Sequence, residues 1–98
     1  MVLILHFYDF IVCHEKGILY PHNDIDDSPY NLRETKEDER LVECQHLCQE
    51  ISGCGFFSFH TPTAMCSLKS GKSREHPQQS YISGKKYCGI FILLHTDF

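Results

Sequence analysis

The chain lacks any apolar run long enough to cross a lipid bilayer. Its longest apolar stretches, at residues 1–12 (MVLILHFYDFIV) and 90–94 (IFILL), fall short of the ~20 residues that a transmembrane helix requires. The first stretch also makes a poor secretory signal peptide, because it has no basic n-region, Asp9 interrupts it, and no small-x-small cleavage site precedes Cys13. We therefore predict no membrane insertion and expect the sequence to be a piece of a larger chain.

Sequence motifs of enzymes are missing as well. We find no Gly-x-Ser-x-Gly, no glycine-rich loop that would hold a phosphate, and no His-Glu-x-x-His. The acidic pair Asp26 and Asp27 lies in a polar, proline-interrupted segment, and we interpret it as solvated. The sequence accordingly predicts no enzymatic activity, no catalytic residue and no cofactor.

Positive charge is scarce, and the net charge of −4 argues against general nucleic-acid binding. The charges are unevenly spread: residues 13–54 hold ten acidic and four basic side chains, whereas residues 66–88 hold five basic and one acidic. The simpler interpretation is two solvated surfaces of opposite sign. The alternative is a basic face that meets an anionic partner.

Cysteine, by contrast, is abundant for a chain of this size. The 98 residues suffice for one small domain, whose thin core benefits from crosslinks. There are six cysteines, an even number, which favours disulfides and an oxidising, secreted or lumenal compartment; they are Cys13, Cys44, Cys48, Cys54, Cys66 and Cys88.

A zinc site in an intracellular domain is the alternative use of these thiols. The pair Cys44 and Cys48 resembles half of a zinc-binding knuckle, but the sequence has no second half. We expect His46, in the middle of a helix, and His60, at a strand end, to face solvent. The sequence therefore predicts no metal site.

One amphipathic helix stands out among short strands. Apolar residues at 41, 44, 47, 48 and 51 have helical spacing and predict a helix over 39–51, with Asp38 or Thr35 as its N-cap and Gly53 just beyond its end. Short strands are predicted over 18–20, 55–59, 65–69, 80–83 and 86–93, with a possible edge strand in 1–12, and loops over 26–40 and 70–79. This pattern predicts an α+β domain in which one helix packs on a small antiparallel sheet.

The helical spacing also limits how the cysteines pair. Cys44 and Cys48 are four residues apart, so their Cβ atoms lie about 5–6 Å apart in a helix, too far for the ~3.5–4.5 Å of a disulfide. Each must therefore bond elsewhere. Cys54 follows the helix end and can fold back towards Cys48, and a strand carrying Cys66 beneath the helix would meet Cys44. Cys13 and Cys88, near the two ends, then remain.

The spacing C-x3-C-x5-C, followed by FFSF and then CSLK, resembles the PAN/apple module. The resemblance covers about residues 13–88 and leaves 1–12 and 89–98 as flanking segments of uncertain status. It implies three disulfides, Cys13–Cys88, Cys44–Cys66 and Cys48–Cys54. The stretches GILYPHNDI and YISGKKYC look most like the PAN modules of micronemal adhesins in apicomplexan parasites.

Candidate ligand-binding side chains are aromatic and basic residues near the predicted sheet, because ligand pockets combine aromatic faces with a few polar groups. We single out Tyr20, Lys69, Tyr81, Lys85, Lys86 and Tyr87. In the predicted strand 55–59, Phe57 and Phe59 share one face and are expected in the core, whereas Phe56 points to the other face.

The PAN/apple resemblance implies an extracellular adhesion module that recognises carbohydrate or protein. The expected partners are a host-surface glycan or protein and other domains of the same chain. That chain is expected to be secreted or surface-bound, with delivery through a secretory organelle such as the microneme. The alternative is a protein-assembly module that docks a partner subunit without binding glycans.

Overall fold

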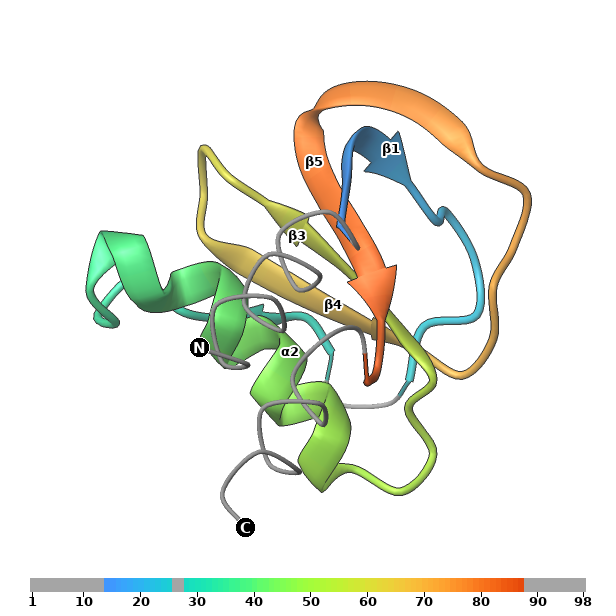
Figure 1. Cartoon of the computed structure of the whole chain (residues 1–98), viewed down its shortest axis with the longest axis horizontal. Helices are drawn as coiled ribbons and strands as arrows, with labels where there is room; N and C mark the ends of the chain where they lie inside the picture. The colour runs from blue at the N-terminus through green and yellow to red at the C-terminus, as the bar shows by residue number, and fades with distance from the viewer. Residues whose placement is uncertain (1–13, 26–27, 88–98) are drawn as a thin grey trace, which may run out of the picture.

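In the computed structural model, one helix packs against one face of an antiparallel sheet (Figure 1). The structure describes residues 14–25 and 28–87. The five strands run in the order β1-β5-β3-β4-β2, with bounds β1 Glu15–Leu19, β2 Tyr30–Asn31, β3 Phe56–His60, β4 Met65–Lys69 and β5 His76–Lys85. Helix α2, Arg40–Glu50, follows the short 3-10 helix η1, Glu37–Glu39. The predicted α+β class is therefore confirmed.

The boundaries of α2 agree closely with the helix predicted over 39–51, but the predicted N-cap is wrong. Asp38 lies inside η1, and the residue that caps α2, Glu39, makes no side-chain hydrogen bond to the helix backbone. The extra turn of 3-10 helix satisfies part of the helix start through the backbone instead, as Glu39 N–H donates to the Lys36 carbonyl at 2.8 Å.

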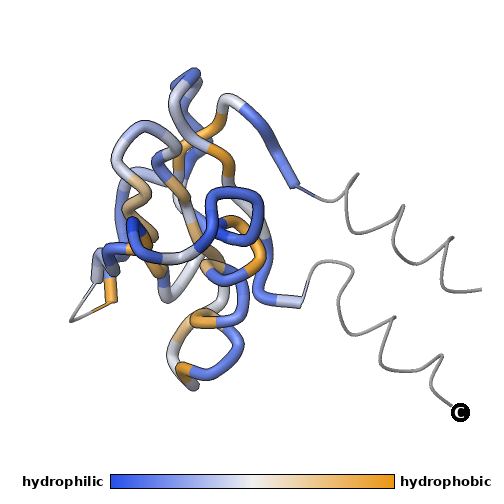
Figure 2. The backbone as a smooth tube through the Cα atoms, turned by 90° about the vertical axis from the view of Figure 1, so that its left-hand side faces the viewer, coloured by the Kyte–Doolittle hydropathy of each residue, from blue (hydrophilic) through white to orange (hydrophobic). Residues whose placement is uncertain are grey.

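The core lies between α2 and the sheet. In β3, Phe57 and Phe59 point towards the helix and are 0% and 5% exposed, as the alternation of the strand predicts, and Phe56 lies on the other face. Hydrophilic residues predominate in the outer loops in Figure 2, and hydrophobic ones recur in the elements that meet at the centre. The helix contacts β3, β4 and β5.

Two disulfides tie α2 to its surroundings. Cys44 joins Cys66 of β4 with a Cα–Cα distance of 5.5 Å, and Cys48 joins Cys54 with a Cα–Cα distance of 5.2 Å. Among the described residues no cysteine is free. The expected Cys13–Cys88 bond lies outside the described residues. Because Cys44 and Cys48 are one helical turn apart, both crosslinks leave the same buried side of the helix.

The sheet differs from the sequence prediction in β1, β2 and β5, and β1 covers Glu15–Leu19 where a strand over 18–20 was predicted. Strand β5 begins at His76, so residues 76–79, predicted as loop, belong to it, whereas Lys86 and Tyr87, predicted as strand, form a turn. The segment 26–40, also predicted as loop, contains β2 and η1. These elements are only two and three residues long, too short for a hydrophobic pattern to mark them. The edge strand expected in 1–12 lies outside the described residues.

Two glycines make the pairing of β1 with β5 possible. The register shifts between Lys16, opposite Ile82, and Ile18, opposite Pro77, and Gly17 between them has a φ of +76°, which glycine adopts without strain. A Cβ atom on Gly84 would lie 2.9 Å from the His14 ring and 3.0 Å from the Phe57 ring, so only glycine lets these rings approach β5.

Candidate functional site

The sheet face opposite α2 carries several of the predicted binding residues, but two of them are buried. Tyr20 is 2% exposed; its hydroxyl donates to the Glu15 carboxylate at 2.5 Å, and its ring meets the edge of Phe56 at a centroid distance of 5.7 Å. Burial raises the pKa of Tyr20, and the hydrogen bond to Glu15 and the negative charges of Glu15 and Glu75 raise it further. Tyr20 is therefore a protonated structural side chain with little surface to offer a ligand.

Lys69 is the second buried member of the predicted set. Its residue is 3% exposed, and its Nζ lies 2.5 Å from the carboxylate of Asp24, which is itself 60% exposed. An isolated bridge between Asp24 and Lys69 brings the 20–25 segment back along β4 and covers the lysine. The sequence gives no sign of this return, so Lys69 looked like a surface cation.

A chain of hydroxyl groups links β1 to the two central strands on this face. The Tyr20 N–H donates to Ser58 Oγ at 3.0 Å, the oxygens of Ser58 and Ser83 are 2.7 Å apart, and Ser83 Oγ donates to the Ile18 carbonyl at 2.6 Å. Since Ser83 uses its proton on Ile18, the Ser58 hydroxyl donates to Ser83. Both serines are fully buried. Every donor in this chain of hydrogen bonds has an acceptor, as buried polar groups require.

Tyr81 and Lys85 lie on this same face opposite α2, which we call the open face; Tyr81 is in the middle of β5 and Lys85 at its end. Tyr81 is half-buried beside His60, with a ring-centroid distance of 4.7 Å, whereas Lys85 is exposed and lies opposite Phe56 in the register. The predicted residues on this face therefore do not converge on one pocket.

Lys86 and Tyr87 form a separate pair in the turn after β5. Tyr87 is 57% exposed, and the Lys86 Nζ lies 5.6 Å from the centre of its ring, within the range of a cation–π contact. The turn is held against α2, because the Gln45 and Gln49 amides donate to the Lys86 carbonyl at 3.2 and 3.0 Å. We call Lys86 and Tyr87 the aromatic platform.

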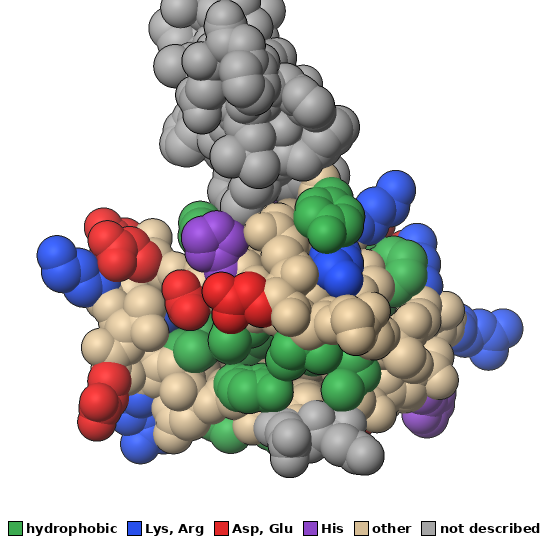
Figure 3. Space-filling model, turned by 90° about the horizontal axis from the view of Figure 1, so that it is seen from below, with side chains coloured by type: hydrophobic (Ala, Val, Ile, Leu, Met, Phe, Trp, Pro, Cys, Tyr) green, Lys and Arg blue, Asp and Glu red, His purple; other side chains and the backbone are tan. Residues whose placement is uncertain are grey.

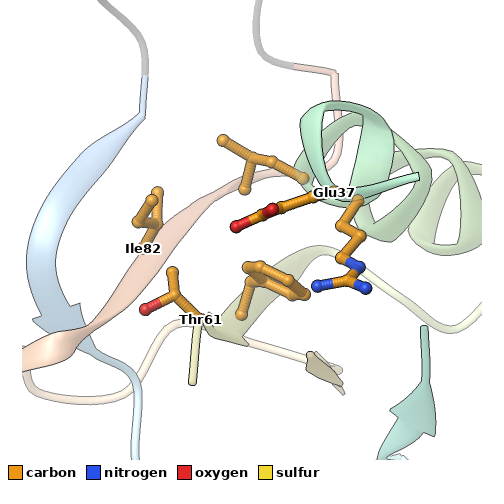
Figure 4. A pocket seen from close by; sticks show the side chains of 6 residues that line it. Glu37, Thr61 and Ile82 are labelled. Atoms are coloured by element: carbon orange, nitrogen blue, oxygen red, sulfur yellow. The ribbon is translucent and has the colours of Figure 1, made fainter. Parts of the chain in front are cut away.

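The sequence analysis does not anticipate a pocket that opens at the other end of α2. Its volume is about 210 Å³, and it lies between η1, the start of α2 and the sheet (Figure 4). The lining residues are Glu37, Arg40, Leu41, Phe59, Thr61 and Ile82. They come from three separate segments of the sequence, at 37–41, 59–61 and 82, so no local motif reveals them. We call this cavity the Glu37 pocket.

Metal binding and membrane spanning find no support in the residues that the structure describes. Within residues 14–25 and 28–87, no three histidine, cysteine, aspartate or glutamate side chains gather in a group that would hold a metal ion. The described helices also include none with the length and apolar character of a membrane span.

Comparison with known families agrees with this architecture of one helix, one sheet and helix-borne disulfides. The family model of the PAN domain matches residues 18–91, about three quarters of the chain. No curated protein sequence matches the chain significantly. PAN domains are typically non-catalytic modules of extracellular proteins that bind protein or carbohydrate. The chain belongs to the PAN domain family.

Proposed function

We propose that this PAN domain is an adhesion module that recognises a glycan on a host surface through the aromatic platform. The observation that carries the proposal is the exposed Tyr87 ring with the Lys86 ammonium beside it. An aromatic face packs against the C–H face of a sugar ring, and an adjacent cation donates to its hydroxyl, carboxylate or sulfate oxygens.

The setting of the platform supports this function because it reduces the ordering cost of binding. Besides the two glutamine amides, the Lys86 N–H donates to the Gly55 carbonyl at 2.9 Å, and its Nζ reaches the Ile51 carbonyl at 3.3 Å. A turn held in this way loses little conformational freedom when a ligand binds. Exposed Lys85 precedes the platform and adds positive charge, so acidic glycans are the preferred class.

The parent protein, on this proposal, is a secreted or surface adhesin. The module comprises residues 13–88, closed by a third disulfide between Cys13 and Cys88, with 1–12 and 89–98 as flanking segments. The resemblance of GILYPHNDI and YISGKKYC to apicomplexan modules supports delivery through an organelle such as the microneme. A single platform binds weakly, and other domains of the same chain would raise the avidity.

A glycan array probed with the whole oxidised chain tests the proposal. We expect signals on sialylated or sulfated glycans, and we expect Tyr87→Ala and Lys86→Ala each to weaken them about tenfold, the loss of one stacking or charged contact. Lys72→Ala is the matched control, because it removes an exposed positive charge from another part of the domain. Silence across neutral, sialylated and sulfated glycans, or an equal loss with Lys72→Ala, would contradict the proposal.

A protein-assembly module is the second candidate function. Figure 3 shows hydrophobic side chains gathered in a band on the underside of the described domain, with acidic side chains beside them. Several hydrophobic residues packed against the core are only partly buried, among them Ile25, Tyr30, Leu47 and Ile51. A pull-down from the native secretory compartment tests it, and recovery of no partner subunit would count against it.

A further inference from the structure

The Glu37 pocket and the aromatic platform lie at opposite ends of α2. The pocket is lined by Arg40 and Leu41 from the first turn of the helix, whereas the platform is bound by Gln49 from the last. An 11-residue helix is about 16 Å long, so the two features are separate surfaces. The pocket can therefore have a ligand of its own.

The lining of the pocket combines an apolar wall with three polar side chains, Glu37, Arg40 and Thr61. Leu41, Phe59 and Ile82 supply the wall. In Figure 4 the carboxylate of Glu37 points across the cavity towards Ile82, and Thr61 lies on the other side of the cavity from Glu37. The Thr61 hydroxyl donates its proton to the Ser80 carbonyl at 3.2 Å, so its lone pairs remain to accept a hydrogen bond. The Glu37 carboxylate and the Thr61 hydroxyl can thus act as acceptors towards a ligand.

The charges around the pocket favour a cation. Within the described residues the ion pairs are Lys69–Asp24 and Lys72–Glu75, so the exposed Glu37 carboxylate has no described cation within 4.0 Å. Arg40 also lines the pocket, but its guanidinium donates to the carbonyls of Thr35 at 2.9 Å and Arg33 at 2.7 Å. Those two bonds tie the guanidinium to the 33–35 loop.

We propose that the Glu37 pocket receives the side chain of a lysine or arginine from a protein ligand. The alkyl stem of such a side chain covers Phe59 and Ile82, while its charged head donates to Glu37 and Thr61. The proposal goes beyond glycan recognition, and it rests on the general role of the domain as a binding module. It assigns a basic protein ligand to one end of the helix and leaves the glycan at the other.

Neither an anion nor a neutral ligand matches this lining equally well. Glu37 would repel a carboxylate or phosphate, and a ligand that meets the Glu37 carboxylate and the Thr61 hydroxyl must bring donors. Acidic residues in a first helical turn also stabilise the helix dipole, and Asp38 and Glu39 have that role here. Glu37 differs from them because it lines an apolar cavity.

The test is a nuclear magnetic resonance titration of the whole oxidised chain with short peptides. The probes are Ac-Gly-Lys-Gly-NH2, its arginine analogue, a norleucine analogue that keeps the stem without the charge, and a glutamate analogue. We expect the basic peptides to shift the methyl signals of Leu41 and Ile82 and the amide of Thr61, with dissociation constants of order millimolar for a single side chain. We expect the glutamate peptide to cause no shift.

Variants separate the pocket from the general acidity of the helix start. Glu37→Gln should weaken the basic peptides about three- to fivefold, the worth of one exposed charge pair. Glu39→Gln makes the same charge change in the same 3-10 turn without lining the pocket, and should leave the affinity unchanged. Spectra of both variants without peptide verify that each retains the fold.

Several outcomes would overturn the inference. These are no shift at the pocket signals, equal shifts with lysine and norleucine peptides, or equal losses in the two glutamate variants. Methyl β-galactoside shifting the same signals would assign the pocket to sugars instead. The glycan proposal is tested separately, because Tyr87→Ala should weaken glycan binding about tenfold while leaving the peptide titration unchanged, and Glu37→Gln should weaken peptide binding while leaving glycan binding unchanged.

Discussion

The two faces of the sheet are held by different kinds of interaction. The helix face is held by two disulfides and by packed aromatic rings. Cys44, Cys48 and Phe57 on this face are fully buried. On the open face, a chain of buried hydroxyl groups and a buried lysine take their place. Side chains alternate along β3, so one strand supplies both environments: Phe57 and Phe59 face the helix, and Ser58 between them faces the other side.

This difference shows how the described part of the chain keeps an ordered sheet with helix α2 covering one of its faces. Apolar burial on one face alone is limited in so small a chain, and crosslinks add to it. The open face gains order from hydrogen bonds whose partners are all satisfied, which fixes β1 against the central strands without a second apolar layer.

Removing a disulfide should have the largest effect, and it tests the helix face. The chain-entropy model gives a loss of about 3 kcal/mol in the free energy of unfolding for a Cys44→Ala/Cys66→Ala double variant, and about 2 kcal/mol for Cys48→Ala/Cys54→Ala. The order follows from the sequence separations of 22 and 6. Urea denaturation measures both, and a greater loss for the shorter loop would contradict the entropic account.

Breaking the hydroxyl chain tests the open face. Ser58→Ala leaves the buried Tyr20 N–H without its acceptor and removes a donor to Ser83. We expect the free energy of unfolding to fall by about 1–3 kcal/mol, the cost of an unsatisfied buried group. Ser67→Ala on β4, where the serine is only partly buried, is the control and should cost far less. Equal losses would mean that the buried chain contributes nothing specific.

The ion pair of Lys69 with Asp24 offers a smaller and asymmetric test. Asp24→Asn leaves a buried ammonium without its counter-charge and should cost about 1 kcal/mol, a value reduced because Asp24 is largely exposed. Lys69→Met replaces the charge with an apolar side chain of similar length and should be close to neutral. Denaturation of both variants decides the point, and a larger loss for Lys69→Met would show that the pair itself stabilises the fold.

The free energy of unfolding should fall at acidic pH because of His14 on the helix face, and at alkaline pH because of Tyr20 on the open face. Burial lowers the pKa of His14, which packs on Phe57, so the unfolded chain takes up a proton first and stability falls as the pH drops below about 6.5. The pKa of Tyr20 is raised, so the unfolded chain loses its proton first and stability falls as the pH rises above about 10.

Single variants assign each end of that pH profile. His14→Gln should flatten the acid side, and Tyr20→Phe should flatten the alkaline side, each by at most about 1.4 kcal/mol per pH unit. The readout is the free energy of unfolding measured from pH 5 to pH 11. His46→Gln, which changes an exposed histidine, is the acid control. An acid slope that persists in His14→Gln would assign the titration to another group.

The helix face was predictable from sequence because its signals are local. The apolar spacing of α2, the aromatic alternation of β3 and the bounds of β4 all follow from neighbouring residues. Helical geometry also excludes a bond between Cys44 and Cys48. The missed N-cap shows the limit of such signals, since a backbone turn replaced the expected Asp38 side chain.

The open face and the Glu37 pocket were not predictable in the same way. Tyr20 and Lys69 are aromatic and basic residues, the types expected in a ligand site. In the structure the 20–25 segment returns along β4, and both side chains are buried. The first half of β5 has polar residues and pairs with β1 through the backbone, so no hydrophobic pattern marks it. Glu37 and Ile82 meet only because the whole fold brings them together.

The antiparallel pairing of β1 with β5 has a mechanical consequence. Glu15 lies opposite Ser83, so the described chain enters β1 and leaves β5 at one edge of the domain. Tension applied through both ends would peel these strands apart one hydrogen bond after another, because the load falls on a single pair at a time. A covalent link between Cys13 and Cys88 would instead bear that tension itself, and its reduction would turn a stiff tether into one that yields.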